Sequence, residues 1–290
     1  MTLASLFLVV LAAFAHASWN LLAKRAASVG PVFVFAYNLV ACVAYAPWVI
    51  WLLAQGGQSW TWLGISFVLV SGLIHLAYSL CLQRGYQVAD LSVVYPVARG
   101  TGPMLSSIGA FVILGETPTG TGLTGLALVV VGILLIATQG KLSAFLRPGG
   151  QAGVRWGVAT GGLIACYTVV DAYAVKALGI APVILDWLSN LMRFGLLLPL
   201  VLANPRKAMA AMKGHWKIAI GVGLLSPLSY ILVLAALSSG APLSLVAPLR
   251  EMSMMVGALM GMLILREPVG FWRLAGCGVL VTGVILLSMS

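Results

Sequence analysis

Ten long apolar segments follow one another along this chain, and they limit its fold more than any other feature of the sequence. A helix that crosses the hydrocarbon core of a bilayer needs about 20 residues. Hydrophobic residues make up 61% of the 290, and charged residues only 8%, too few to cover a surface exposed to water. The sequence therefore predicts an all-α membrane protein with ten transmembrane helices. Their predicted ranges are 3–23, 31–54, 62–83, 91–114, 121–139, 153–176, 182–203, 216–238, 243–265 and 270–288.

Basic residues are distributed unevenly between the loops. The loops after the odd-numbered segments hold twelve of them, whereas the other loops hold only Lys176. The positive-inside rule then predicts a multi-pass protein of the bacterial inner membrane, with the odd loops cytoplasmic and both termini extracytoplasmic. The formal charge of +10 forms no continuous patch, so we expect the bilayer, and no nucleic acid, as a partner. The twelve are Lys24, Arg25, Arg84, Lys141, Arg147, Arg155, Arg206, Lys207, Lys213, Lys217, Arg266 and Arg273.

Motifs for metal binding and catalysis are missing from the sequence. The four cysteines stand singly in apolar segments, without a CxxC spacing. No Walker-type loop, HExxH or GxSxG motif occurs either. We therefore expect no metal, no cofactor and no enzymatic activity.

The two halves of the chain repeat each other. An offset of about 152 residues aligns Asn38 with Asn190 and Pro96 with Pro248, and an offset of 151 aligns Glu116 with Glu267. Five helices in each half force the second copy into the opposite membrane orientation, the usual construction of secondary transporters. We predict a first repeat at 1–140, a cytoplasmic linker at 141–152 and a second repeat at 153–290.

Two stretches carry a more specific resemblance. Residues 89–116 (ADLSVVYPVARGTGPMLSSIGAFVILGE) and 241–267 (APLSLVAPLREMSMMVGALMGMLILRE) each combine an apolar run, a Pro, a long helix and a Glu. They resemble the EamA repeat of the drug/metabolite transporter superfamily, and within it the chain is most similar to bacterial exporters of amino acids, of the aromatic type. The resemblance implies that helices 1, 3, 4, 6, 8 and 9 line a central pathway.

Charged residues at membrane depth need a partner, a wet cavity or a function, since burying each one costs about 2.5 to 3.5 kcal/mol. The predicted spans contain three Arg residues and three acidic residues at this depth. Two interpretations therefore stay open: ion pairs between helices, or a site for a zwitterion. The residues are Arg99, Arg193, Arg250, Asp171, Asp186 and Glu251.

Polar residues at helical spacing mark the candidate substrate site. We expect Arg99 or Arg250 to bind a carboxylate and Asp171 to bind an ammonium group or a proton. The aromatic residues either surround the substrate or are ordinary core residues. The candidates are Trp19, His75, Tyr78, Ser79, Tyr95, Arg99, Tyr167, Asp171, Tyr230 and Arg250.

Four titratable residues are candidates for proton coupling: His16, His75, Asp171 and Glu251. The histidines have an alternative role as helix contacts, and uncoupled export stays open. The stripe Asp186, Asn190 and Arg193 on the seventh segment favours a structural network, because this helix packs outside the pathway in the family that the chain resembles.

Prolines and glycines indicate how the helices bend and pack. Pro96, Pro103, Pro227 and Pro248 are candidate gating hinges, with static kinks as the alternative. Gly125, Gly132, Gly276 and Gly283 allow close helix packing. The sequence slightly favours a monomer.

We therefore hypothesise a secondary exporter of small zwitterionic metabolites, amino acids above all, that works by alternating access. The alternatives are the same fold with a sugar, nucleoside or organic cation as cargo, and a membrane protein that transports nothing. An organic cation would need an unpaired carboxylate, and Asp171 is the candidate.

Overall fold

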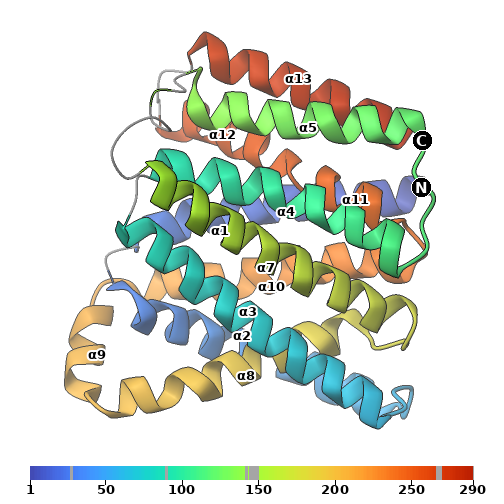
Figure 1. Cartoon of the computed structure of the whole chain (residues 1–290). Helices are drawn as coiled ribbons and strands as arrows, with labels where there is room; N and C mark the ends of the chain where they lie inside the picture. Colours follow the sequence, from blue (N-terminus) through green and yellow to red (C-terminus); the bar gives the residue numbers. More distant parts are fainter. Residues whose placement is uncertain (27–28, 89–90, 141–142, 144–149, 266–269, 290) are drawn as a thin grey trace.

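The computed structural model describes the chain except for residues 27–28, 89–90, 141–142, 144–149, 266–269 and 290, and the described part contains no strand (Figure 1). The predicted Glu267 and most of the predicted linker lie outside the described residues. In the first half the helices are α1 (Leu3–Lys24), α2 (Pro31–Ala54), α3 (Trp62–Val88), α4 (Leu91–Ile113) and α5 (Gly120–Thr138). In the second half they are α7 (Gly150–Lys176), α8 (Pro182–Leu202), α9 (Pro205–Met212), α10 (Trp216–Ser238), α11 (Leu243–Leu249), α12 (Met252–Leu265) and α13 (Phe271–Ser288).

Eight helices of the described part are long and apolar enough to cross a membrane: α1, α2, α3, α5, α7, α8, α10 and α13. They make the chain a multi-pass membrane protein. The remaining predicted spans coincide with α4, which has 23 residues and carries Arg99, and with the pair α11 and α12. The count of ten spans stays a prediction.

The ninth predicted span is not one helix, and on this point the sequence prediction is wrong. The helix breaks at Arg250 and Glu251, between the 7 residues of α11 and the 14 of α12. Backbone bonds tighten from i−4 to i−3 here, because Glu251 N–H donates to Pro248 O and Ser253 N–H to Arg250 O. Pro248 also removes an N–H from the helix, which leaves the carbonyl of Ser244 without its i+4 donor.

The helices run roughly along one direction, and both termini lie at the same end of the bundle (Figure 1). We call it the termini end; it holds the connections 55–61, 114–119, 177–181 and 239–242. The short helix α9 lies across the opposite end (Figure 1).

Helices α5 and α13 pack with their backbones in contact, through glycines that the sequence analysis assigned to packing. A Cβ atom on Gly125 would lie 2.8 Å from the carbonyl oxygen of Gly283, and one on Gly276 would lie 3.0 Å from that of Gly132. An offset of 151 residues converts the first contact into the second. The two repeats are therefore related by an approximate two-fold axis through this interface.

Helices α4 and α7 pack as closely, through a motif that the sequence analysis missed. A Cβ on Gly157 would lie 2.6 Å from Cβ of Val97, and one on Gly161 would lie 2.7 Å from Cβ of Thr101. Gly157 and Gly161 form a GxxxG pair, which was visible in the sequence. A Cβ on Gly257, which is also part of a GxxxG, would meet only Cβ of Ala17 among the described residues, at 4.0 Å.

Candidate functional site

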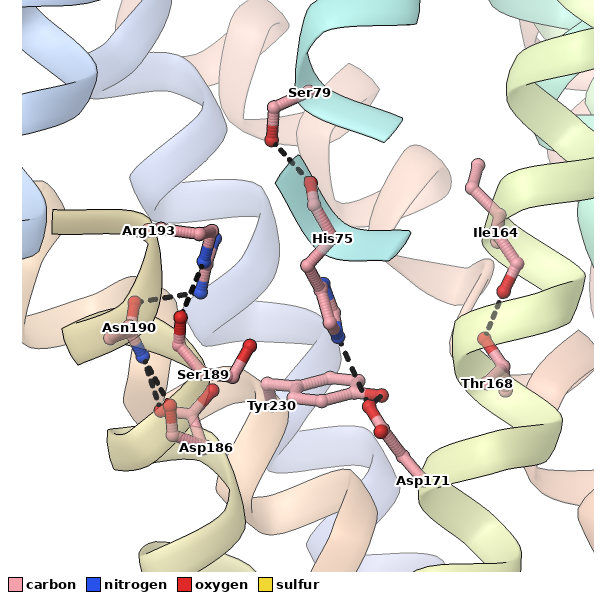
Figure 2. A network of polar contacts seen from close by, with 10 residues as sticks. All are labelled: His75, Ser79, Ile164, Thr168, Asp171, Asp186, Ser189, Asn190, Arg193 and Tyr230. Carbon is pink, nitrogen blue, oxygen red and sulfur yellow. Dashed lines mark hydrogen bonds and ion pairs between the residues drawn. The ribbon is translucent and has the colours of Figure 1, made fainter. Parts of the chain in front are cut away.

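Asp171 lies at the centre of a buried polar cluster between α3, α7 and α10. Its Oδ2 accepts a hydrogen bond from the Tyr230 hydroxyl at 2.6 Å and lies 3.0 Å from Nε2 of His75 (Figure 2). Its other oxygen, Oδ1, is buried and has no hydrogen-bond partner among the described residues. A buried carboxylate oxygen without a donor is costly, so this atom is ready to accept a donor from a ligand.

Aromatic rings surround this carboxylate. The His75 ring stacks on Tyr167 with a centroid distance of 4.0 Å, and Tyr230 meets His75 edge to face at 5.4 Å. Tyr78 meets Tyr167 at 5.6 Å. Stacked aromatic faces next to a carboxylate form an environment that suits a cationic group.

Arg99 on α4 is held by groups at the break between α11 and α12. Its Nη2 lies 2.7 Å from Oε2 of Glu251 and donates to Oγ of Ser253 at 3.0 Å. The guanidinium also lies 6.0 Å from the ring centre of Tyr95. Arg99 therefore has a structural ion pair in this conformation, one of the two roles that the sequence left open.

Arg250 has fewer hydrogen-bond partners than Arg99 among the described residues. Its side chain is 4% exposed, and its nearest acidic atom is Oε1 of the neighbouring Glu251, 3.7 Å from Nε. Neither Nε nor Nη2 has a hydrogen-bond partner among the described residues. The turn at the helix break brings the side chains of Arg250 and Glu251 together.

The two clusters differ in the charged groups that they bring together. Arg99 and Arg250 share the single carboxylate of Glu251, which leaves one positive charge in excess, whereas Asp171 faces His75 and Tyr230. Helix α11, which ends beside Arg250, packs against α7 and α10, the helices that carry Asp171 and Tyr230, so the clusters lie on neighbouring elements. Among the described residues, the first cluster has unpaired donors on Arg250 and the second has an unpaired acceptor on Asp171.

A second polar network runs along α8, as the sequence predicted. Asn190 donates to Oδ2 of Asp186 at 2.8 Å, and Arg193 donates to Oδ1 of Asn190 at 2.7 Å (Figure 2). These bonds all lie within α8. Asn38, the repeat counterpart of Asn190, donates to Val34 O on its own helix α2.

Other predicted residues lie elsewhere or use their polar atoms locally. His16 and Trp19 on α1 contact each other edge to face at 5.0 Å, and the buried Nε1 of Trp19 has no hydrogen-bond partner in the described part of the chain. The Ser79 hydroxyl donates to the backbone of His75. Pro96 and Pro103 lie within the continuous helix α4, Pro227 lies within α10, and Pro248 precedes the helix break.

Ser253 is the site residue that the sequence analysis missed. No pattern marks it, because its position next to Arg99 depends on the turn at residues 250–251. The described residues contain no group of three His, Cys, Asp or Glu that could hold a metal ion.

Helices of membrane-spanning length, a two-fold repeat and buried opposite charges where the halves meet define the class of multi-pass membrane transporters. Within that class, a model of the EamA-like transporter family matches residues 3–138 and 151–289. The chain belongs to this family.

Two individual proteins are similar to this chain. The multidrug resistance protein EbrB of Bacillus subtilis (strain 168) is 32% identical over 87 residues, which are 30% of this chain and 68% of EbrB. A solved crystal structure superposes with a TM-score of 0.79 at 14% identity, over 100% of this chain and 98% of the other. At that identity the second likeness shows the fold alone.

Proposed function

We propose that this protein is a secondary transporter that exports small zwitterionic metabolites, amino acids above all, across the bacterial inner membrane. The observation that carries the proposal is the pair of unsatisfied groups at membrane depth. Nε and Nη2 of Arg250 are buried donors without an acceptor, and Oδ1 of Asp171 is a buried acceptor without a donor, among the described residues. An α-amino acid supplies one carboxylate and one ammonium group, which would satisfy both.

Alternating access of the two repeats is the mechanism that we propose. Transporters with inverted repeats bind their substrate near the midplane, where the repeats meet, often at a broken helix. Here Asp171 and Arg250 belong to the second repeat and Arg99 and His75 to the first, and the break at residues 250–251 provides the discontinuous helix. The proposal includes ten spans, with α4 and the α11–α12 pair crossing as well, and an extracytoplasmic termini end.

Proteoliposomes loaded with labelled amino acids test this function. We expect the wild type to release at least one of them, and Arg250→Gln and Asp171→Asn to lower the rate by about tenfold or more, since each loses a charge-assisted bond to substrate. Arg250→Lys should also be impaired, because an ammonium group lacks the planar fork of Arg. Ser66→Ala is the matched control on the same helix α3, because its hydroxyl donates to the backbone of Leu63 and its side chain is exposed.

Failure of the wild type to move any of the common amino acids would remove the proposed cargo. The assay has to include folded protein, as judged by a single symmetrical peak in size-exclusion chromatography. Under that condition a negative result concerns the cargo and not the preparation.

Export of organic cations is the second candidate, favoured by the similarity to a multidrug resistance protein. Asp171 and its stacked aromatic neighbours would bind the cation, whereas Arg250 would make no contact with such a substrate. The same variants separate the candidates. Cation export should be lost in Asp171→Asn and retained in Arg250→Gln, whereas amino-acid export needs both residues.

Coupling to protons, where it occurs, we assign to the Asp171 and His75 pair. These two groups are in direct contact, and protonation of either one changes the charge that faces the substrate. Efflux measured with and without an imposed pH gradient tests the assignment. A gradient should accelerate the wild type and leave the His75→Asn variant unaffected.

A further inference from the structure

The termini end of the bundle is closed by a carboxylate that joins the two repeats. Glu116, in the connection after α4, accepts hydrogen bonds from the backbone N–H of Leu243 at 2.7 Å and of Ser244 at 2.9 Å. Its Oε1 also lies 3.2 Å from Nζ of Lys176, which donates to the carbonyl of Ala241 at 3.1 Å. One side chain of the first repeat thus holds the end of α7 and the first turn of α11.

Further contacts between the repeats lie at this same end. The hydroxyls of Ser5 and Ser239 are 3.1 Å apart, and Oε1 of Gln58 accepts a hydrogen bond from Ala181 N–H at 3.1 Å. These contacts are neutral, whereas those of Glu116 are charge-assisted and therefore about twice as strong. Glu116 is thus the strongest single tie between the repeats at the termini end, among the described contacts.

Helix α11 connects this tie to the substrate site. It spans only 7 residues, about 10 Å of helix, between the bonds to Glu116 and the break that carries Arg250. The Ser107 hydroxyl of α4 donates to the carbonyl of Ser244 at 3.3 Å. This is the carbonyl that lacks its i+4 donor because of Pro248. A movement of α11 away from Glu116 would therefore displace Arg250 and expose Ser107.

We propose that Glu116 is the latch of the extracytoplasmic gate. Its carboxylate holds α11 in the closed position, and outward release of substrate requires its bonds to Leu243, Ser244 and Lys176 to break. The inference rests on the alternating-access function proposed above and adds the residue that controls one side of it. A charged latch in a short connection suits a gate, because water can solvate the carboxylate once it is released.

Accessibility of position 107 reports directly on this gate, whatever the cargo. Ser107 is fully buried on α4, so a cysteine there should react slowly with a membrane-impermeant maleimide added from outside. The experiment uses the full chain in right-side-out vesicles, with the native cysteines replaced by alanine and Ser107→Cys introduced. Glu116→Gln keeps the shape of the side chain and removes its charge, and we expect it to raise the labelling rate roughly tenfold.

Three further variants define the mechanism. Lys176→Met leaves the backbone bonds to Glu116 intact and should raise the rate by a smaller factor. Glu116→Asp, which keeps the carboxylate, should label more slowly than Glu116→Gln. Thr117→Ala is the matched control, an exposed neighbour in the same connection, and should label at the wild-type rate.

Sidedness separates a gate from general loosening of the fold. The increase should occur with reagent added from outside and be absent in inside-out vesicles. Folded Glu116→Gln protein that labels at the wild-type rate would overturn the latch, and if that variant does not fold, unchanged labelling of Lys176→Met would do so. Loss of the amino-acid assignment alone would leave these rates unaffected, so the two proposals fail separately.

Discussion

Glu251 is the one carboxylate in contact with both buried arginines of the central site, among the described residues, so its removal should be more harmful than that of an ordinary ion-pair member. Deleting one partner of a buried pair costs about 3 to 5 kcal/mol, because it leaves an uncompensated charge. We expect Glu251→Gln to lower the midpoint of thermal unfolding by several degrees. The double variant Arg99→Met with Glu251→Gln should recover part of that loss, whereas strictly additive effects would contradict the shared ion pair.

Protonation of Glu116 gives the proposed latch a pH dependence. Burial disfavours the charged carboxylate, but hydrogen bonds from Ser244 and Leu243, together with the Lys176 ammonium group that faces it, hold the pKa of Glu116 below its ordinary value of 4.5. A carboxylate whose pKa is depressed in the closed state stabilises that state above its ordinary pKa and loses the effect as the pH falls through the lowered value.

Labelling of the Ser107→Cys variant should therefore be fastest in acid. We expect its rate, divided by that of a Thr121→Cys variant at an exposed position, to be constant above about pH 5 and to rise below pH 4.5. The ratio removes the pH dependence of the thiol reaction itself. When Glu116→Gln is added, the ratio should not change with pH, and an equal rise there would assign the effect to another group.

At the scale of elements, the glycines of α13 have unequal importance. Gly276 packs against the backbone of α5, whereas a Cβ on Gly278 would meet no atom within 4 Å. Gly276→Ala should destabilise the protein by about 1 to 3 kcal/mol through overpacking, and Gly278→Ala should be neutral or slightly stabilising. Thermal unfolding of the two variants in the same detergent measures the difference; equal midpoints would contradict the close α5–α13 contact.

Helix existence and helix continuity differ in how well the sequence predicts them. Each long apolar segment predicts a helix, because length and hydropathy suffice for a membrane span. The break at residues 250–251 could not be predicted in this way, because Pro96 has the same position in the first repeat and α4 continues through it. The difference arises from the ion pairs and hydrogen bonds that the turn makes with Arg99, which are contacts between repeats.

For the candidate site, the sequence likewise predicts which residues belong to it but not how their charged groups pair. Polar stripes indicated His75, Tyr167, Asp171 and Tyr230, and the structure places these side chains in contact. The pairing of charges was not readable, because the predicted spans contain three Arg and three acidic residues at membrane depth and the sequence does not say which of them meet. The sequence named both Arg99 and Arg250 as candidates for binding a carboxylate, and the contacts of Arg99 with Glu251 and Ser253 are the reason to propose Arg250 for this role.

At the scale of the whole molecule, the orientation in the membrane is a prediction with a direct test. Both termini lie at one end of the bundle (Figure 1), and the positive-inside rule, applied to the basic residues of the odd loops, predicts that this end is outside. Alkaline phosphatase fused after residue 290 should be active in intact cells, since it folds only outside the cytoplasm. A green fluorescent protein fused at the same position should be dark, and bright fluorescence would reverse the topology.

The glycine contacts between α5 and α13 also say what kind of interface joins the halves. The contact of Gly125 with Gly283 and that of Gly132 with Gly276 exchange under the 151-residue offset, so each half presents the same patch to the other. This is the isologous arrangement that two identical subunits adopt around a two-fold axis. The chain is thus organised like a dimer of two related, covalently linked halves. A substitution at one of these glycines alters an interface to which its counterpart in the other half also belongs.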